Sequence, residues 1–434
     1  MPAVGSSLRR AAGFAAVSLL ALTVSLFDGI ALIGFALVAI TGVLISEGSL
    51  FRTFADRAEQ RSRRLVGLPK FAAVAALLAG WTVLDVIPAE VFAGVVLLVG
   101  FGYLGAETAR LLQSDRLMET AGFITVGVLG YALGHTIGGG LDVDSAAIGT
   151  LAMAGALVGA LLRAVFWARR DGLLLLVLGG FLWGLFMLPF PSAQTVALAI
   201  VTSIVLAYLA LIIGVASVTG MTTGVLMVFL TIVFGGLAWV TMLVAFFGIG
   251  GLATKYRYLE KRARGVAEAN RGARGTGNVL GNTIVALGAV LAYAGASGNQ
   301  TAELVFAFAF AGAIATALSD TLSSEIGSLY DRPMLITSFD RVSPGTDGAV
   351  TVPGTLAGAA GAGIVAGIFV LLGPAGAAGG VVILIAGTVG MLVDSFLGAV
   401  VEDRLIGNHG VNAAATFAGA LLAGLFAIGL VYTG

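Results

Sequence analysis

The chain has 434 residues, of which 59% are hydrophobic and 11% charged, and its mean hydropathy is +1.04. A soluble domain of this length exposes more polar surface than such a composition supplies, so we expect a polytopic membrane protein. The absence of cysteine excludes disulfides, thiolate metal sites and cysteine nucleophiles. Lys and Arg number 23, as do Asp and Glu, and this balance gives no support to a nucleic-acid partner.

Apolar runs long enough to cross a bilayer recur along the whole chain. We expect an all-α transmembrane helical bundle with about fifteen spans, and at least thirteen. The expected spans are 11–27, 29–46, 71–87, 90–109, 120–138, 146–167, 172–189, 194–217, 222–234, 236–253, 279–296, 302–320, 349–372, 377–401 and 411–432.

Basic residues set the expected orientation of these spans. With fifteen spans and the N-terminus in the cytoplasm, all 23 Lys and Arg fall on the inner side, as the positive-inside rule requires. Merging 222–234 with 236–253 would send the basic cluster of the 254–278 loop outside, and Gly235–Gly236 favours a break there. We therefore expect a multi-pass protein of the cell membrane in which the polar motifs after residue 253 face the cytoplasm.

The two parts of the chain differ in their polar content. Residues 1–193 carry charges mainly at span ends and in loops, so they form a multi-span region whose role the sequence does not define. Residues 194–434 carry polar motifs repeatedly at the expected cytoplasmic ends of their helices. We expect the second part to hold the chemistry.

The first motifs after the boundary are basic or rich in glycine. Lys255 stands at a span end, where its long side chain either snorkels or reaches a phosphate. A Gly-rich loop then precedes a helix expected to open near Val279, and backbone N–H groups at a helix start form an anion cradle. The Lys-Ser/Thr pair of a P-loop is absent, so this is not a Walker A motif. The candidate phosphate-binding residues here are Lys255, Arg271, Arg274, Gly275, Gly277 and Asn282.

The segment 318–327 places two carboxylates and several hydroxyls where an uncharged apolar run ends. Ionisable groups at membrane depth are costly, which makes this segment a candidate site; a solvated helix end is the alternative. Asp320 and Ser324 share a helix face, whereas Asp320 and Glu325 are about 140° apart and reach one ion only if the helix ends or unwinds. Carboxylate and hydroxyl oxygens suit Mg²⁺, which bridges protein carboxylates and phosphates.

Later motifs complete the polar set. Arg341 is the base nearest a Pro-Gly-Thr-Asp-Gly turn and is a candidate phosphate clamp, while Asp347 in that turn is expected to cap the next helix. Asp394 lies about two turns inside the end of its span, a costly depth for a carboxylate. Asn412 opens the last span and is a candidate phosphate-binding residue with Ser324.

Taken in order, these motifs resemble the family of the plant phytyl-phosphate kinase and of animal transmembrane protein nineteen. The stretches that carry the resemblance are Leu-Ala-Thr-Lys255, Arg-Gly-x-Gly-x-Val-Leu-Gly-Asn282, Ser-Asp320-Thr-x-Ser-Ser-Glu325-Ile-Gly, Ile-Thr-Ser-Phe, Pro-Gly-Thr-x-Gly-Ala-Val-Thr-Val and Asp394-Ser-x-Leu-Gly-Ala. The similarity covers residues 194–434 and leaves residues 1–193 outside it.

The resemblance implies transfer of a phosphoryl group from CTP, or another nucleoside triphosphate, to an isoprenyl monophosphate such as phytyl phosphate. Asp320, Glu325, Asp394 and Arg341 are then the expected catalytic residues, with Mg²⁺ on the three carboxylates. A cytidylyltransferase that makes a CDP-activated lipid would use the same parts and stays an alternative. A transporter or flippase is a further alternative, although residues 1–193 lack the buried charges expected near its midplane.

Overall fold

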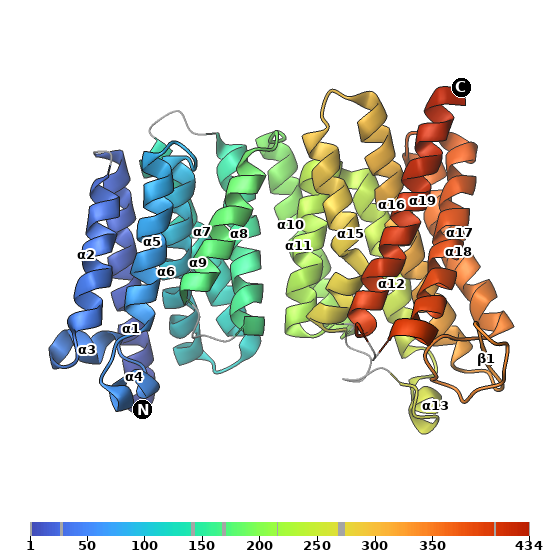
Figure 1. The fold of residues 1–434 in the computed structure, drawn as a ribbon, viewed down its shortest axis with the longest axis horizontal. Coiled ribbons are helices and arrows are strands. Elements are labelled where there is room, and N and C mark those ends of the chain that lie inside the picture. The colour runs from blue at the N-terminus through green and yellow to red at the C-terminus, as the bar shows by residue number, and fades with distance from the viewer. Residues whose placement is uncertain are drawn as a thin grey trace. The chain divides into compact units, whose positions relative to one another are not determined.

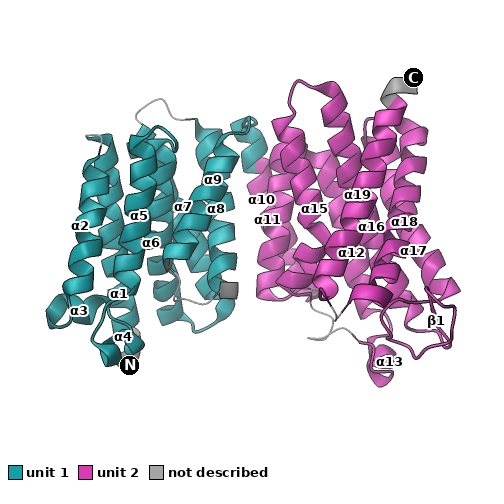
Figure 2. Cartoon of the chain, in the orientation of Figure 1, with its two compact units in different colours: residues 1–197 teal, residues 198–434 magenta. Residues whose placement is uncertain are grey.

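The computed structural model describes residues 2–26, 29–139, 144–166, 171–214, 216–267, 274–402 and 405–433. The chain forms two compact units, residues 1–197 and 198–434, which Figure 2 shows in different colours. Apart from one two-stranded sheet, the regular structure in the described residues is helical, which confirms the expected all-α membrane fold. The assignment of different roles to residues 1–193 and 194–434 stays a prediction, because compactness does not reveal function.

Unit 1 is a bundle of long apolar helices joined by short connections (Figure 1). Its elements are α1 (Pro2–Ser18), η1 (Leu19–Ser25), α2 (Ile30–Leu44), α3 (Gly48–Phe54), α4 (Arg57–Ser62), α5 (Gly67–Val83), α6 (Ala89–Leu112), α7 (Arg116–Gly139), α8 (Ser145–Phe166) and α9 (Asp171–Phe186), while α10 (Ala193–Ile213) crosses the boundary between the units.

Glycines bring the backbones of α6 and α7 into direct contact. A Cβ atom on Gly122 would stand 2.5 Å from the carbonyl oxygen of Gly105, and one on Gly134 would stand 2.5 Å from that of Ala93. Such small residues let helices pack closely in lipid, where no hydrophobic effect draws them together.

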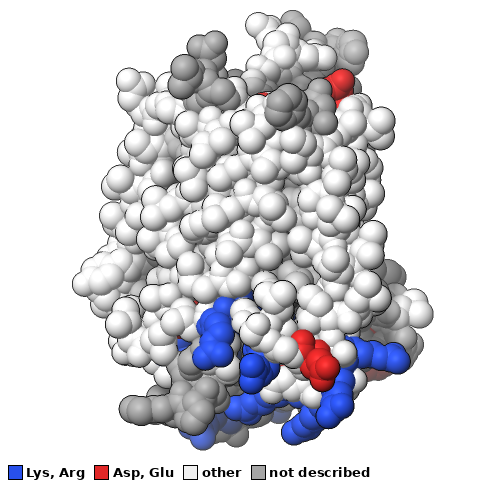
Figure 3. Space-filling view, turned by 90° about the vertical axis from the view of Figure 1, so that its left-hand side faces the viewer, with Lys and Arg blue, Asp and Glu red and all other residues white. Residues whose placement is uncertain are grey.

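Basic side chains of unit 1 gather at one end. On the face shown in Figure 3, Lys and Arg side chains lie at the lower end, and most of the remaining surface is uncharged. Ion pairs join helix ends there, with 3.9 Å between Arg10 and Asp56 and 3.6 Å between Arg163 and Glu119. Charge segregated in this way matches the pattern that the positive-inside rule describes.

Unit 2 surrounds one central helix. Its further elements are α11 (Val218–Gly235), α12 (Leu237–Lys255), α13 (Tyr258–Ala263), α15 (Thr276–Gly295), α16 (Gln300–Gly327), β1 (Met334–Leu335), β2 (Ala349–Val350), α17 (Val352–Leu372), α18 (Gly376–Val401) and α19 (Asn408–Thr433). Helix α16 contacts α12, α15, α17, α18 and α19, and its residues 310–319 are all buried. Glycines again allow this packing, since a Cβ on Gly312 would stand 2.6 Å from the carbonyl oxygen of Gly419.

The break expected at Gly235–Gly236 is present. Helix α11 ends at Gly235 and α12 begins at Leu237, with Gly236 between them at φ +88°, a conformation that glycine adopts readily. The two helices are therefore separate, whereas the side on which the basic cluster after residue 253 lies stays a prediction.

Within the described residues, twelve helices are long and apolar enough to cross a membrane, or thirteen if the bent pair α2 and α3 is one span. Each expected span overlaps a helix in the described residues, but α5 and α9 belong to a shorter apolar class. The count of fifteen and the cytoplasmic N-terminus stay predictions.

Candidate functional site

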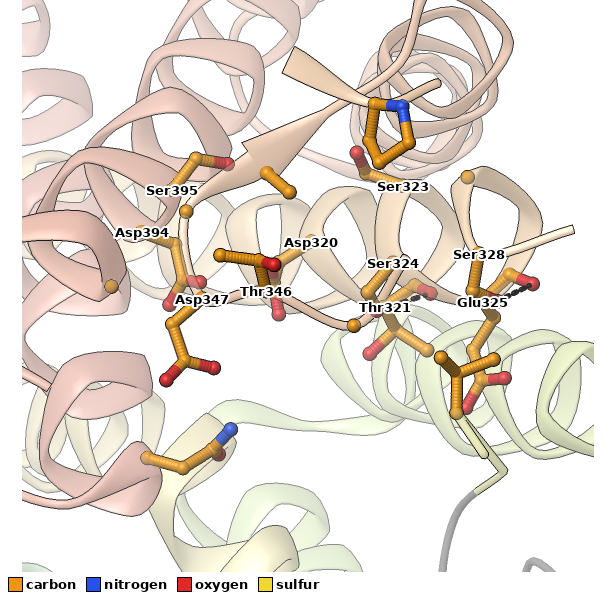
Figure 4. Close-up of a pocket in the computed structure, with 18 of the residues that line it drawn as sticks. Asp320, Thr321, Ser323, Ser324, Glu325, Ser328, Thr346, Asp347, Asp394 and Ser395 are labelled. Carbon is orange, nitrogen blue, oxygen red and sulfur yellow. Dashed lines mark hydrogen bonds between the residues drawn. The ribbon is translucent and has the colours of Figure 1, made fainter. Parts of the chain in front are cut away.

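A pocket of about 450 Å³ opens at one end of unit 2, where the polar motifs converge. Its volume is in the range of small-molecule sites, about 300–1,000 Å³. Figure 4 shows Asp320, Thr321, Ser324 and Glu325 along one helix, with Asp394 and Ser395 on its neighbour. The candidate residues that line it are Arg274, Asn282, Asp320, Ser324, Glu325, Asp394 and Asn412.

Two aspartates from different helices meet in this pocket. Asp320 on α16 and Asp394 on α18 lie within hydrogen-bonding contact through their side chains. Two carboxyl groups this close repel each other unless a proton or a cation lies between them. The carboxylate of Glu402 adds negative charge at Asp394, so this wall of the pocket is strongly acidic.

The opposing charge comes from Arg274, which is 6% exposed and lines the pocket just before α15 begins. Its guanidinium stacks on the ring of Phe246 at 5.2 Å and donates a hydrogen bond to the hydroxyl of Thr321 at 3.3 Å. Its charge also acts on Asp320. Helix packing thus holds a guanidinium, the side chain that best matches phosphate oxygens, beside the acidic wall.

Asparagines connect the acidic wall to α15 and α19. In the amide orientation that satisfies its neighbours, Asn412 donates to Asp394 at 3.2 Å and accepts from Asn282 at 3.0 Å. Asn282 on α15, Asp394 on α18 and Asn412 on α19 therefore form one hydrogen-bonded row.

Glu325 lies apart from the two aspartates and forms an ion pair with a lysine. Because α16 continues without a break to Gly327, Glu325 points away from Asp320, as the helical spacing predicts. It pairs with Lys261 at 2.5 Å, and Lys261 is only 1% exposed. The Lys261 ammonium also donates to the carbonyl oxygens of Ala253 and Thr254 at the end of α12.

Lys261 is the main residue that the sequence motifs do not reveal. It stands among several other bases between α12 and α15, and no local pattern separates it from those that face solvent. Its distinguishing feature is a partner 64 residues away, which only the fold brings near.

A hairpin closes one side of the pocket. Strands β1 and β2 pair antiparallel, and the turn 344–348 lines the cavity. Gly348 has φ +74°, and a Cβ there would stand 2.5 Å from the Cβ of Ala399 on α18. The expected capping by Asp347 is wrong: α17 begins at Val352, and Thr351 caps it by accepting from the N–H of Gly354 at 3.1 Å.

Other predicted residues lie elsewhere. Lys255 donates to the carbonyl oxygen of Ile213, and Arg341 lies exposed in the hairpin, outside the pocket lining. Gly275 precedes the first turn of α15, which begins at Thr276 rather than near Val279, and Gly277 packs under His409. Arg271 falls outside the described residues.

The carboxylates do not form one preassembled set of metal ligands. Within the described ranges, no group of three or more His, Asp or Glu is arranged to hold an ion. The pair Asp320 and Asp394 does fit Mg²⁺, which binds through one or two carboxylates and completes its shell with water and phosphate oxygens.

Fold and pocket together define a polytopic helical membrane protein with a polar pocket at its helix ends, lined by both acidic and basic side chains. The comparisons with known proteins agree: residues 201–420 match the family described as Integral membrane protein DUF92, and the chain belongs to it. The resemblance predicted from the motifs of the C-terminal part is confirmed.

Three relatives are each similar to part of the chain. Protein VTE6, chloroplastic, of Arabidopsis thaliana is 35% identical over 172 residues, which are 39% of this chain and 51% of that protein. An uncharacterized membrane protein of Synechocystis is 35% identical, over 44% of this chain and 76% of its own length. One of Methanocaldococcus jannaschii is 36% identical, over 45% of this chain and 79% of its own length. No solved structure matches significantly.

Proposed function

We propose that this protein is an isoprenoid lipid kinase, which transfers a phosphoryl group from CTP or another nucleoside triphosphate to an isoprenyl monophosphate. The observation that carries the proposal is the pocket at the helix ends, where Arg274 faces the pair Asp320 and Asp394. The motif resemblance and the similarity to the plant VTE6 protein support the same activity.

Phosphoryl transfer depends on positioning and charge stabilisation more than on covalent chemistry of the protein. Arg274 neutralises phosphate oxygens, and its stacking on Phe246 fixes where its charge lies. The N–H groups at the start of α15 and the turn 344–348 supply further donors near the pocket. These groups hold two anionic substrates close together in spite of their mutual repulsion.

Asp320 and Asp394 would hold Mg²⁺ together with substrate phosphate oxygens. When bound, the ion neutralises charge that develops on the transferred group. Asn412 keeps the Asp394 carboxylate oriented, and Asn282 in turn orients Asn412.

The reaction balances without a protein nucleophile. An ionised oxygen of the isoprenyl monophosphate attacks the γ-phosphorus, a new P–O bond forms, and the bond to the β–γ bridging oxygen breaks. The products are an isoprenyl diphosphate and a nucleoside diphosphate. Because the attacking oxygen is already ionised, no general base is required.

The direct test uses purified protein, Mg²⁺, geranylgeranyl or phytyl monophosphate, and CTP labelled either in the γ-phosphate or in the cytidine. We expect the γ-label in the lipid diphosphate and the cytidine label in the aqueous phase, with ATP and GTP assayed in parallel. Cytidine label in the lipid would overturn the kinase in favour of a cytidylyltransferase, and absence of any transfer would refute both.

A further inference from the structure

A second cavity lies in unit 2, and its lining is entirely apolar. This groove of about 400 Å³ runs between α15 and α19 over α16. On α15 it extends from Val285 to Ala292, and on α19 from Phe417 to Ile428, or about 17 Å along that helix axis. The helices that form it are labelled side by side in Figure 1.

The groove follows the polar pocket along the same helices, as a separate cavity. On α15, Asn278 and Asn282 line the pocket while Val285 and Ala289 line the groove, and all four share one helix face. Only about 4.5 Å of helix axis separates Asn282 from Val285. The hydrogen bond between Asn282 and Asn412 lies where α15 and α19 meet between the two cavities.

Small residues give the groove its depth. Gly288 and Ala292 on α15 and Gly424 on α19 leave the space open, while Phe306 and Phe417 supply bulk beside it. A Cβ added at Gly288 would meet no atom within 4 Å, so the space beside this glycine is free rather than filled by a neighbouring helix.

We infer that this groove binds the hydrocarbon chain of the lipid whose phosphate occupies the polar pocket. The inference rests on the proposed function for the nature of that lipid, an isoprenyl monophosphate. An apolar groove that ends at the hydrogen-bonded asparagines beside a polar pocket matches a molecule with an apolar chain and an anionic head.

The first experiment locates the chain without relying on catalysis. The full chain, reconstituted in phospholipid nanodiscs, is irradiated with geranylgeranyl monophosphate that carries a photoreactive group at the tail of its chain. We expect cross-links in segments 285–292, 305–309 and 417–428, which line the groove, and excess unlabelled geranylgeranyl monophosphate should suppress them. Cross-links elsewhere, or labelling of the groove that the competitor leaves unchanged, as bulk lipid would give, overturn the inference.

The second experiment fills the groove. Gly288→Leu is expected to weaken binding of geranylgeranyl monophosphate by about tenfold, the order of one misfitted group in an apolar pocket. Isopentenyl monophosphate, with one isoprene unit, ends before Gly288 and should bind the variant as well as it binds the unaltered protein. Gly367→Leu is the matched control, because Gly367 is also an exposed mid-helix glycine with no atom within 4 Å of an added Cβ.

Equal weakening in both variants, or equal weakening for long and short chains, would contradict the assigned groove. The binding readouts separate this inference from the proposed reaction. Competed cross-links in the groove with no γ-label transfer support the groove and refute the kinase. Label transfer with cross-links outside the groove supports the kinase and refutes the groove.

Discussion

The pocket obtains its charge from side chains that other helices hold in place. Asp320 and Asp394 come from α16 and α18, and Arg274 is fixed by the ring of Phe246 on α12. Each of these residues taken alone is an isolated charge near a span end. Together they form an acidic pair opposed by a guanidinium, which is the charge pattern that phosphoryl transfer requires.

Removing either carboxylate should stop catalysis without unfolding the protein. Asp320→Asn and Asp394→Asn each keep the side-chain volume and remove the charge that would hold Mg²⁺. We expect the initial rate of diphosphate formation to fall by about 100-fold or more, with wild-type amounts of folded protein in size-exclusion profiles.

The matched control for these variants is Asp331→Asn. Asp331 pairs with Arg264 at 2.9 Å, is 81% exposed and lies outside the pocket lining. It should retain full activity. Substantial turnover by both pocket variants would contradict the acidic pair as the catalytic centre.

The pair of buried Lys261 and part-buried Glu325 should matter for stability. Lys261→Met leaves the Glu325 carboxylate without this partner, and breaking such a pair costs at most about 3 kcal/mol, because Glu325 keeps some contact with water. We expect a clearly lower unfolding temperature in detergent, and the double variant Lys261→Met/Glu325→Gln should recover part of the loss. An unchanged unfolding temperature of the single variant would refute a structural role for the pair.

Many of these residues are predictable from the sequence, but several of their partners are not. Asp394 stood out because its depth in a span is costly, and it does line the pocket. Lys255, a lysine at a span end, has an equally suggestive position in the sequence, yet its ammonium donates to a carbonyl oxygen at the end of α10. Lys261 could not be singled out, because the glutamate that pairs with it is distant in the sequence.

At the level of elements, helical spacing predicted more than residue type did. The angle between Asp320 and Glu325 implied separate roles in an unbroken helix, and α16 is unbroken to Gly327. For the hairpin the sequence predicts only a turn before a helix, because the two short strands carry no periodic pattern of their own. Its contact with α18 depends on tertiary packing at Gly348.

Gly348 should be needed to seat the hairpin. In Gly348→Ala, the new Cβ would stand 2.5 Å from Ala399 and 2.6 Å from the carbonyl oxygen of Ser395, so the turn must lift from α18. We expect at least about a tenfold loss of kcat/KM, since a small misplacement of groups around a reaction is costly.

The control for backbone strain is Gly298→Ala, in the connection between α15 and α16. Gly298 has φ +89° and no atom within 4 Å of an added Cβ. It should lose about 1 kcal/mol of stability from the strained backbone and keep its activity. If Gly348→Ala turns over at the rate of Gly298→Ala, the seating of the hairpin is not required.

For the whole molecule, the hydrophobic pattern predicted the helical membrane fold and the location of the spans. It did so because the bilayer imposes one length scale on every span. In unit 2, the ends of α10, α12 and α16 meet at the pocket end, as the charge distribution predicted. The packing of α15, α18 and α19 around the pocket could not be predicted from the sequence. The apolar surfaces of helices in lipid carry little information on which helix packs against which.

The chain contains no cysteine, which makes its orientation directly testable. Ser297, between α15 and α16, and Arg262, within α13, are both exposed, so each can be replaced by a single cysteine that a reagent can reach. We expect a membrane-impermeant maleimide to label Ser297→Cys but not Arg262→Cys in intact cells. The opposite pattern would place the pocket outside and contradict the positive-inside assignment.

We propose that unit 2 transfers a phosphoryl group from a soluble nucleotide to the phosphate of a lipid. To test this, every product formed by the purified protein from CTP and geranylgeranyl monophosphate is quantified. We expect equal amounts of CDP and geranylgeranyl diphosphate, with no CDP released when the lipid is omitted. Pyrophosphate together with a CMP-linked lipid, or nucleotide breakdown without a lipid product, would contradict it.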